Sequence, residues 1–192
     1  MRIVIIDSTK IVQALSYLLI FIQRAGKIKL VKLLYIADKY HLIQYGRTIT
    51  NDEFWATKLG PVGYATSDVL NIEENDELGN PDYTSLMLKK VDKYVFESIN
   101  NNKDDLDALS ESDIEVLDIV IDKFGNMDKL CLIDYCHRYR EWNQYKEILE
   151  NNPNKKVKIY TRELLSIIGD EPFKISKNHM EMSKKIFMGM VN

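Results

Sequence analysis

Residues 27–62 read KIKLVKLLYIADKYHLIQYGRTITNDEFWATKLGPV, and the rest of the chain is organised around this stretch. Apolar residues recur three and four positions apart in its first half, which is the spacing of one face of an α-helix. Gly46 follows Tyr45, where a glycine in the left-handed conformation commonly ends a helix. A polar turn, a short apolar run at residues 53–57 and Gly60-Pro61 come next. The stretch therefore predicts a buried helix, a rigid turn and an edge strand.

The length and composition are typical of a single globular domain. The chain has 192 residues, of which 45% are hydrophobic and 29% charged, and this is enough to bury a core. The net charge of −3 argues against non-specific nucleic-acid binding, which needs a positive surface, and suits a basic partner better. Two helices joined near Gly26 faintly resemble a helix-turn-helix, but the second is too apolar to lie in a DNA groove. Nucleic acid is therefore not the expected partner.

The reactive residue types are scattered along the chain. His41, His137 and His179 fall on three separate predicted elements, so the paired spacing of metal ligands does not occur. Cys131 and Cys136 lie five positions apart in an apolar helical pattern, which predicts reduced and inert core thiols. The sequence contains no glycine-rich phosphate-binding motif and no nucleophile elbow. We therefore expect no catalytic, cofactor-binding or metal-binding site, and no enzyme.

No segment of the sequence predicts secretion or a membrane span. The apolar run at residues 3–6 is too short for a signal peptide. The longer run at residues 17–22 falls far short of the roughly 20 residues that a membrane span needs. We therefore expect a soluble, cytoplasmic protein.

The N-terminal half predicts helices and one small sheet. Five elements are expected beyond the opening stretch: a strand at residues 2–6, a helix at residues 9–24 ended by Gly26, a short helix at residues 64–72, an acidic loop at residues 73–82, and a β-hairpin of residues 86–91 and 94–99. We expect the strand at residues 53–57 to join this hairpin in the same sheet.

The C-terminal half predicts further helices and a tail. The expected helices are residues 110–124, capped by Ser110 with Asp113 and ended by Gly125; residues 127–138, capped by Asn126; residues 141–150; and residues 160–168. The basic, methionine-rich tail is either a terminal helix folded back on the domain, a frayed end, or a segment that adapts to a partner. The predicted fold class is mostly α: a single helical domain at residues 1–170 with a small inserted antiparallel β-sheet, and a tail at residues 171–192.

Asp38 is the exceptional carboxylate, because it lies inside the apolar helix. It stands beside Ala37 and so borders the buried face. It either faces solvent, which its residue type favours, or bonds to Arg47 or to the turn that follows the helix.

Three blocks of sequence, occurring in order, resemble the Panacea domain, the SocA/GepA-like antitoxin family of bacteria and their phages. The first is LVKLLYIADKYHL with YGRTITNDEF and KLGPV, the second is LSESDIEVLD followed by KFG, and the third is the tryptophan of YREW. The resemblance covers about residues 8–168. Thr48 stands where the family often has proline, Asn51 where it often has glycine, and Gly63 where a proline is common. These departures should affect the rigidity of the turn more than the fold.

The resemblance implies an antitoxin of a type II toxin–antitoxin system, which neutralises a cognate protein toxin by binding it directly in a complex such as a heterotetramer. The family's toxins are diverse, and some are related to small alarmone synthetases that attack translation. Two alternatives are a proteolytic adaptor, which delivers a toxin to a protease through the tail, and a phage protein that neutralises a host toxin. The toxin's identity and the stoichiometry stay open at the level of the sequence.

Aromatic residues around the turn are the candidates for contact with such a partner. A stable protein interface buries about 1,600 Å² around a few aromatic anchors. The expected partner-binding residues are Tyr45, Arg47, Phe54, Trp55, Tyr64 and Phe187. Because Phe54 and Trp55 are neighbours in a strand, their side chains face opposite ways, and one of them is expected in the core.

Overall fold

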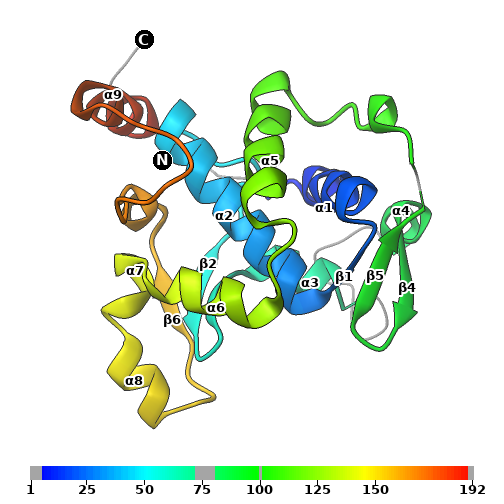
Figure 1. Cartoon of the computed structure of the whole chain (residues 1–192), viewed down its shortest axis with the longest axis horizontal. Helices are drawn as coiled ribbons and strands as arrows, with labels where there is room; N and C mark the ends of the chain where they lie inside the picture. Colours follow the sequence, from blue (N-terminus) through cyan, green and yellow to red (C-terminus); the bar gives the residue numbers. More distant parts are fainter. Residues whose placement is uncertain (1–5, 72–80, 100, 190–192) are drawn as a thin grey trace.

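The computed structural model of the chain describes residues 6–71, 81–99 and 101–189 (Figure 1). Its α-helices are α1 (Ser8–Ile22), α2 (Lys27–Tyr45), α3 (Tyr64–Val69), α4 (Pro81–Met87), α5 (Glu111–Phe124), α6 (Lys129–His137), α7 (Arg140–Asn143), α8 (Lys146–Asn151) and α9 (Lys177–Phe187). Its strands are β1 (Arg24–Gly26), β2 (Phe54–Thr57), β3 (Gly60–Gly63), β4 (Leu88–Asp92), β5 (Val95–Ser98) and β6 (Val157–Ile159), and its 3₁₀ helices are η1 (Lys103–Asp105) and η2 (Thr161–Leu164). The described part is mostly helical with small antiparallel sheets, which confirms the predicted fold class.

Helix α2 runs through the centre of the molecule, with α1, α5 and α6 packed around it (Figure 1). Its predicted end is confirmed, since Gly46 closes the helix with φ +73°. The helix is buried on all sides and not only along its apolar stripe: Lys32, Asp38, Lys39 and His41 are each at most 1% exposed. Buried polar groups require partners, so α2 is where the surrounding elements attach.

A buried ion pair joins α2 to the C-terminal half of the chain. Lys39 Nζ lies 2.6 Å from Glu141 Oε1 on α7, and it also donates to the carbonyl oxygen of Leu164 on η2 at 2.9 Å. The Tyr35 hydroxyl donates to the same glutamate at 2.7 Å. Because loss of either partner would leave a buried charge alone, this link fixes α7 and η2 against α2.

The two three-stranded antiparallel sheets have the strand orders β1-β5-β4, at the right edge of Figure 1, and β3-β2-β6, left of its centre. The predicted hairpin is confirmed as β4 and β5. The expectation that residues 53–57 join it is wrong, because β2 pairs with β3 and with the distant β6. The place beside β5 is taken by β1. The chain leaves α1 at Gln23, with φ +62°, so Gly26 precedes α2 and does not end α1.

Three predictions for the C-terminal half are wrong in detail. The residue that caps α6 is Asp128 and not Asn126, since the Asp128 carboxylate accepts from the N–H groups of Leu130 and Cys131. The helix expected at residues 141–150 is broken into α7 and α8. The segment at residues 160–168 contains no α-helix but only η2, which follows directly after β6.

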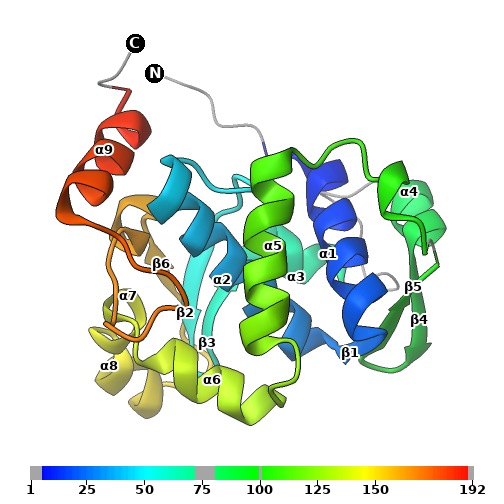
Figure 2. The same ribbon diagram turned by 45° about the horizontal axis from the view of Figure 1, so that its top comes forward.

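The capping of α5 and the folded-back tail agree with the sequence. Ser110 Oγ accepts from the N–H of Asp113 at 3.3 Å, and Asp113 Oδ2 accepts from the N–H of Ser110 at 2.9 Å. Helix α9 packs against the C-terminal end of α2 (Figure 2). The strand predicted at residues 2–6 and most of the loop at residues 73–82 lie outside the described residues.

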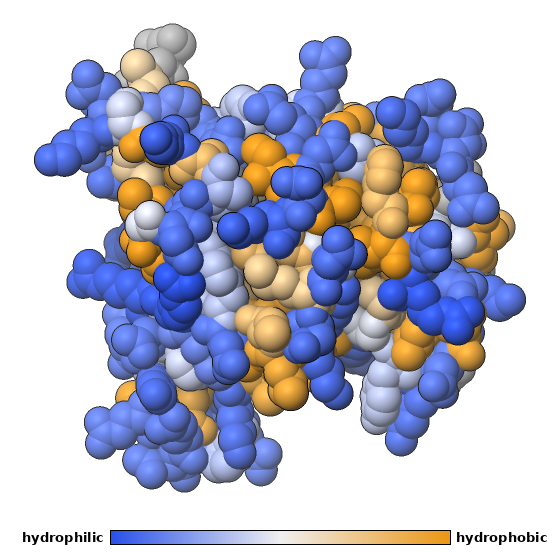
Figure 3. All heavy atoms as spheres, in the orientation of Figure 1, coloured by the Kyte–Doolittle hydropathy of each residue, from blue (hydrophilic) through white to orange (hydrophobic). Residues whose placement is uncertain are grey.

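The surface shown in Figure 3 is mainly hydrophilic. Apolar side chains show over α1, α5 and α6, with hydrophilic side chains between them. Cys131 is exposed, which corrects its prediction as a core thiol, whereas Cys136 is buried as predicted. Among the described helices, none combines the length and the apolar character that crossing a membrane requires.

Candidate functional site

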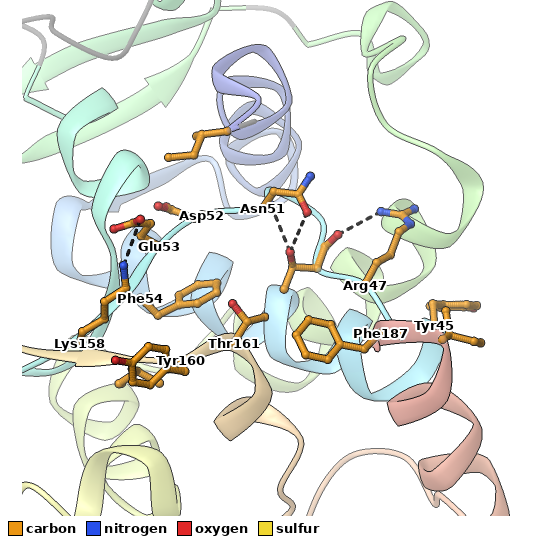
Figure 4. Close-up of a pocket in the computed structure, with 15 residues that line it drawn as sticks. Tyr45, Arg47, Asn51, Asp52, Glu53, Phe54, Lys158, Tyr160, Thr161 and Phe187 are labelled. Atoms are coloured by element: carbon orange, nitrogen blue, oxygen red, sulfur yellow. Dashed lines mark hydrogen bonds and ion pairs between the residues drawn. The ribbon is translucent and has the colours of Figure 1, made fainter. Parts of the chain in front are cut away.

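An open groove of about 830 Å³ lies beside the pair formed by Phe54 and Ile159, the last pair of the ladder between β2 and β6 (Figure 4). Residues 45–48 and 51–54, which form the turn after α2, make its first wall. Residues 158–161 with Ile186 and Phe187 make the second wall, and Ile6 completes the lining. The two walls are more than 100 residues apart in the sequence, so only folding brings them together.

The buried Asp38 holds the turn of the first wall. Its carboxylate accepts from the N–H groups of Ile49 at 2.8 Å and Thr50 at 2.9 Å, and from the Thr50 hydroxyl at 2.6 Å. The expectation that Asp38 faces solvent is therefore wrong, and the alternative, a bond to the turn, is confirmed. Burial raises the pKa of Asp38 to about 7, although the hydrogen bonds from Thr50 and Ile49 favour its ionised form.

Asp52 holds the other end of this turn. Its carboxylate accepts from the N–H groups of Ala65 and Thr66 at 2.8 Å each, which are unpaired donors at the start of α3. A Cβ on Gly63 would lie 2.3 Å from Asp52 Oδ2, so this arrangement requires a glycine. This is the position at which a proline is common in the family that the sequence resembles. Asn51 has φ +55°, a region that asparagine tolerates better than most residues. Two of the three departures from the family pattern, Gly63 and Asn51, therefore fit the turn.

A charged cluster ties the start of the turn to α5. Arg47 lies 2.9 Å from Asp113 Oδ1, His41 Nε2 lies 3.1 Å from the same oxygen, and Lys10 Nζ lies 2.7 Å from the other. Burial by itself would raise the pKa of Asp113, but hydrogen bonds from His41, Lys10 and Ser110 outweigh it and hold the pKa well below its usual range. Arg47 is thus engaged in a structural ion pair, and its side chain remains 42% exposed.

The groove brings together four of the six predicted contact residues: Tyr45, Arg47, Phe54 and Phe187. Phe54 forms the floor; it is 1% exposed and packs against the Tyr35 ring at 5.7 Å between centroids. Phe187 and Tyr45 lie on the side of α9 and α2 (Figure 4). The Tyr45 hydroxyl donates to Glu115 at 2.7 Å, and this hydrogen bond raises its pKa to about 12.

Trp55 and Tyr64 lie outside the groove lining. Trp55 is the outward member of the pair with Phe54, as one of the two had to be, and it is half-buried on the other face of the sheet. Lys158 Nζ lies 5.9 Å from its ring. Its indole Nε1 is buried without a hydrogen-bond partner in the described part of the chain, an unusual state for a group that normally finds an acceptor. Tyr64 opens α3 and is 46% exposed.

Of the residues in the second wall, the sequence predicted only Phe187 as a contact residue. Lys158, Tyr160, Thr161 and Ile186 line the groove, and Lys158 forms an ion pair with Glu53 of the first wall at 3.1 Å. A signal for the strand is present in KVKIY at residues 156–160, where polar and apolar residues alternate with the period of a strand. Across the residues that the structure describes, no three histidine, cysteine or acidic side chains are grouped so as to hold a metal ion.

The fold and the groove together place the chain in a structural class of proteins. This class is a mostly helical domain with an open groove lined by aromatic and charged side chains. A family model described as "Antitoxin SocA-like, Panacea domain" matches residues 30–143. Because the match covers more than half of the chain, the chain belongs to this family of antitoxin-like proteins, as the three sequence blocks predicted. No curated protein and no solved structure gives a significant match.

Proposed function

We propose that this protein is an antitoxin that neutralises a cognate protein toxin by binding it directly, and that it acts without catalysis. The observation that carries the proposal is the groove, which gathers four predicted contact residues, three of them within the region that the family model matches. Its lining combines aromatic side chains with polar and charged ones, and protein–protein interfaces likewise have aromatic anchors within a polar rim. The toxin would cover the groove and the neighbouring outer face of β2.

The finer points of the proposal come from the family resemblance. They are a type II system, a toxin related to small alarmone synthetases that acts on translation, and a complex such as a heterotetramer. A phage-encoded neutraliser of a host toxin would use the same binding chemistry. A proteolytic adaptor is a different mechanism, and the exposed Met182 and Met188 of the α9 region, 51% and 58% exposed, are its candidate protease-facing residues.

The test begins with purification of the tagged protein from its native host and mass spectrometry of what accompanies it. The recovered protein is then expressed alone and together with the tagged chain. An antitoxin predicts that the recovered protein alone arrests growth and that coexpression restores it. Recovery of a protease as the main companion would favour the adaptor. A companion that is harmless when expressed alone would refute the antitoxin proposal.

A further inference from the structure

The charge of the chain is divided unevenly, and one stretch is basic. Residues 138–162, which form α7, α8 and β6 and lead into η2, hold three glutamates and seven lysines or arginines. This stretch therefore carries a net charge of +4, whereas the whole chain carries −3. The three elements lie together at the lower left of Figure 1. The net charge of the whole chain thus does not describe this region, which attracts an acidic partner.

A small pocket of about 260 Å³ lies at the end of this stretch, between α7 and η2. Its lining is mostly polar or charged and includes Arg140, Glu141, Gln144, Arg162 and Glu163. Helix α7 lies inside residues 30–143, which the family model matches, and η2 lies beyond them. The described residues that line this pocket are all different from those that line the groove, so the pocket is a separate site.

Both glutamates in the lining of this pocket are already engaged with other groups. Glu141 is buried, and its Oε1 lies 2.6 Å from Lys39 Nζ. Glu163 Oε1 accepts from the Gln144 amide at 2.9 Å, and its Oε2 accepts from the N–H of Tyr160 at 2.7 Å. The acceptors of the pocket are therefore occupied by donors from elsewhere in the fold.

The two arginines of the lining, by contrast, have no acidic partner in the described part of the chain. Both are exposed. The Arg140 side chain forms no hydrogen bond and no ion pair with another described residue, and the Arg162 guanidinium contacts only the Tyr160 ring, 5.4 Å from its centroid. Each remaining arginine that the structure describes is paired with a carboxylate: Arg24 with Glu97, Arg47 with Asp113, and Arg138 with Asp170.

The pocket thus has one positive charge in excess. Since Lys39 neutralises Glu141, the charges of Arg140 and Arg162 are opposed by Glu163 alone. One carboxylate would complete the balance, and a guanidinium binds a carboxylate through two parallel N–H···O bonds. A phosphate dianion would bring a second negative charge close to Glu163, and like charges repel. The lining therefore favours a carboxylate over a phosphate.

We infer that this pocket binds an aspartate or glutamate side chain of the partner protein, held between Arg140 and Arg162. The identification of the partner as a toxin rests on the proposed function, but the carboxylate site does not. Tyr160, which Arg162 contacts, also lines the groove, so one partner can cover both sites. The acidic side chain would then fix the orientation of the partner on the groove.

The first experiment titrates the full chain with N-acetyl-glutamate N-methylamide, a mimic of one glutamate residue, and follows the Nε–H resonances of the arginines by NMR. Saturable shifts are expected at Arg140 and Arg162. Arg138 is the internal control, because it is 48% exposed and close in sequence but is paired with Asp170. The corresponding glutamine compound, which carries no charge, should shift none of these resonances.

A titration with inorganic phosphate tests the other oxyanion. Phosphate should bind more weakly than the glutamate mimic, because of the repulsion from Glu163. Phosphate binding as tight as that of the mimic would overturn the assignment to a carboxylate. The absence of saturable shifts at Arg140 and Arg162, or equal shifts at Arg138, would overturn the site itself.

The second experiment measures the affinity of the companion protein that purification from the host recovers. Arg140→Gln and Arg162→Gln should each weaken binding about tenfold or more, because each leaves the partner's carboxylate without its full set of donors. Lys155→Gln is the matched control, since it removes an exposed positive charge of the same stretch outside the pocket, and it should bind as the wild type does. Circular dichroism verifies that the variants are folded.

Equal losses of affinity in all three variants would reduce the effect to a general attraction by the basic stretch and would overturn the inference. Unchanged affinity in Arg140→Gln and Arg162→Gln would overturn it as well. A companion whose binding requires both arginines but which is harmless when expressed alone would refute the proposed function and leave the carboxylate site standing.

Discussion

At the scale of single residues, Lys32 and Trp142 hold the turn between β2 and β3, which contains Leu59, by donating hydrogen bonds to the backbone on either side of it. Lys32 is 1% exposed and donates to the carbonyl oxygen of Pro61 at 2.6 Å. Trp142 Nε1 donates to the carbonyl oxygen of Thr57 at 2.7 Å. The turn between β2 and β3 is thus held by two donors from other elements, and one of them is a buried cation.

The buried position of Lys32 makes the stability of the protein depend on pH. Burial lowers the pKa of Lys32 from 10.5 to about 8. Between these values the unfolded chain binds the proton and the folded protein does not, so stability rises with pH in this range. The free energy of unfolding of the wild type, relative to Lys32→Met, should therefore increase by up to about 1.4 kcal/mol per pH unit from about pH 8 to 10.5. Urea denaturation at several pH values measures this difference, and a constant difference would contradict the prediction.

Phe54 and Trp55 should separate folding from partner binding. Phe54 is 1% exposed, so Phe54→Ala should lower the free energy of unfolding by about 3–5 kcal/mol. Trp55 faces outward on the opposite side of β2, so Trp55→Ala should leave the protein folded and weaken toxin binding about tenfold or more. Chemical denaturation and titration with the purified toxin measure the two effects. Unchanged neutralisation by Trp55→Ala would remove this residue from the proposed interface.

At the scale of elements, the joint between α2 and α9 places Ile186 and Phe187 in the groove wall. Gly46 ends α2 with φ +73°, and a Cβ at this position would lie 2.6 Å from Ile186 Cβ and 2.8 Å from the carbonyl oxygen of Ser183. The glycine is required both by the left-handed backbone and by the close approach of α9.

Gly46→Ala should therefore detach α9 while the rest of the fold remains. Hydrogen exchange should become faster in α9 and stay slow in α1 and α5, and the free energy of unfolding should fall by about 1–2 kcal/mol. Gly169→Ala is the matched control, since Gly169 also has a positive φ, +92°, but has no neighbour within 4 Å of an added Cβ. It should cost stability without exposing α9. Full protection of α9 in Gly46→Ala would show that the joint tolerates a side chain.

At the scale of the whole molecule, the tail has two parts: Ile186 and Phe187 line the groove, whereas Met182 and Met188 are exposed outside it. From the sequence, deletion of residues 172–192 is expected to remove contact with a protease while leaving toxin binding intact, and so to test the adaptor mechanism. The structure shows that this deletion also removes Ile186 and Phe187 from the groove wall and Phe173 from its contact with the Tyr40 ring, 4.7 Å between centroids. The deletion would therefore impair toxin binding in either mechanism.

A double substitution separates the two mechanisms instead. Met182 and Met188 are exposed and lie outside the groove lining, so Met182→Ser with Met188→Ser should leave the affinity for purified toxin unchanged. For a direct blocker, we expect growth rescue and toxin levels in cells to stay as in the wild type. Accumulation of toxin in cells with unchanged affinity in vitro would instead establish the adaptor. Immunoblotting of the toxin during coexpression measures this.

The elements that the sequence predicted correctly are those that local chemistry determines. The C-terminal end of α2, the capping box of α5 and the hairpin of β4 and β5 each depend on residues close together in the sequence. The three sequence blocks likewise identified the family. Three of the eight residues of the first wall, Tyr45, Arg47 and Phe54, were among the predicted contact residues, because they lie in one continuous stretch beside the helix end.

Tertiary structure alone decided the rest, because the pairing of β2 with β6 and of Lys39 with Glu141 joins residues about 100 positions apart. Residues 53–57 carry no feature that distinguishes β6 from the nearer hairpin as a partner, and in the folded chain β2 pairs with β6. Asp38 is buried only because the turn supplies three donors, and Lys39 only because Glu141 reaches it. The sequence by itself thus determined the central helix, its turn and the family. Packing across the chain determined the second wall and, with it, the groove.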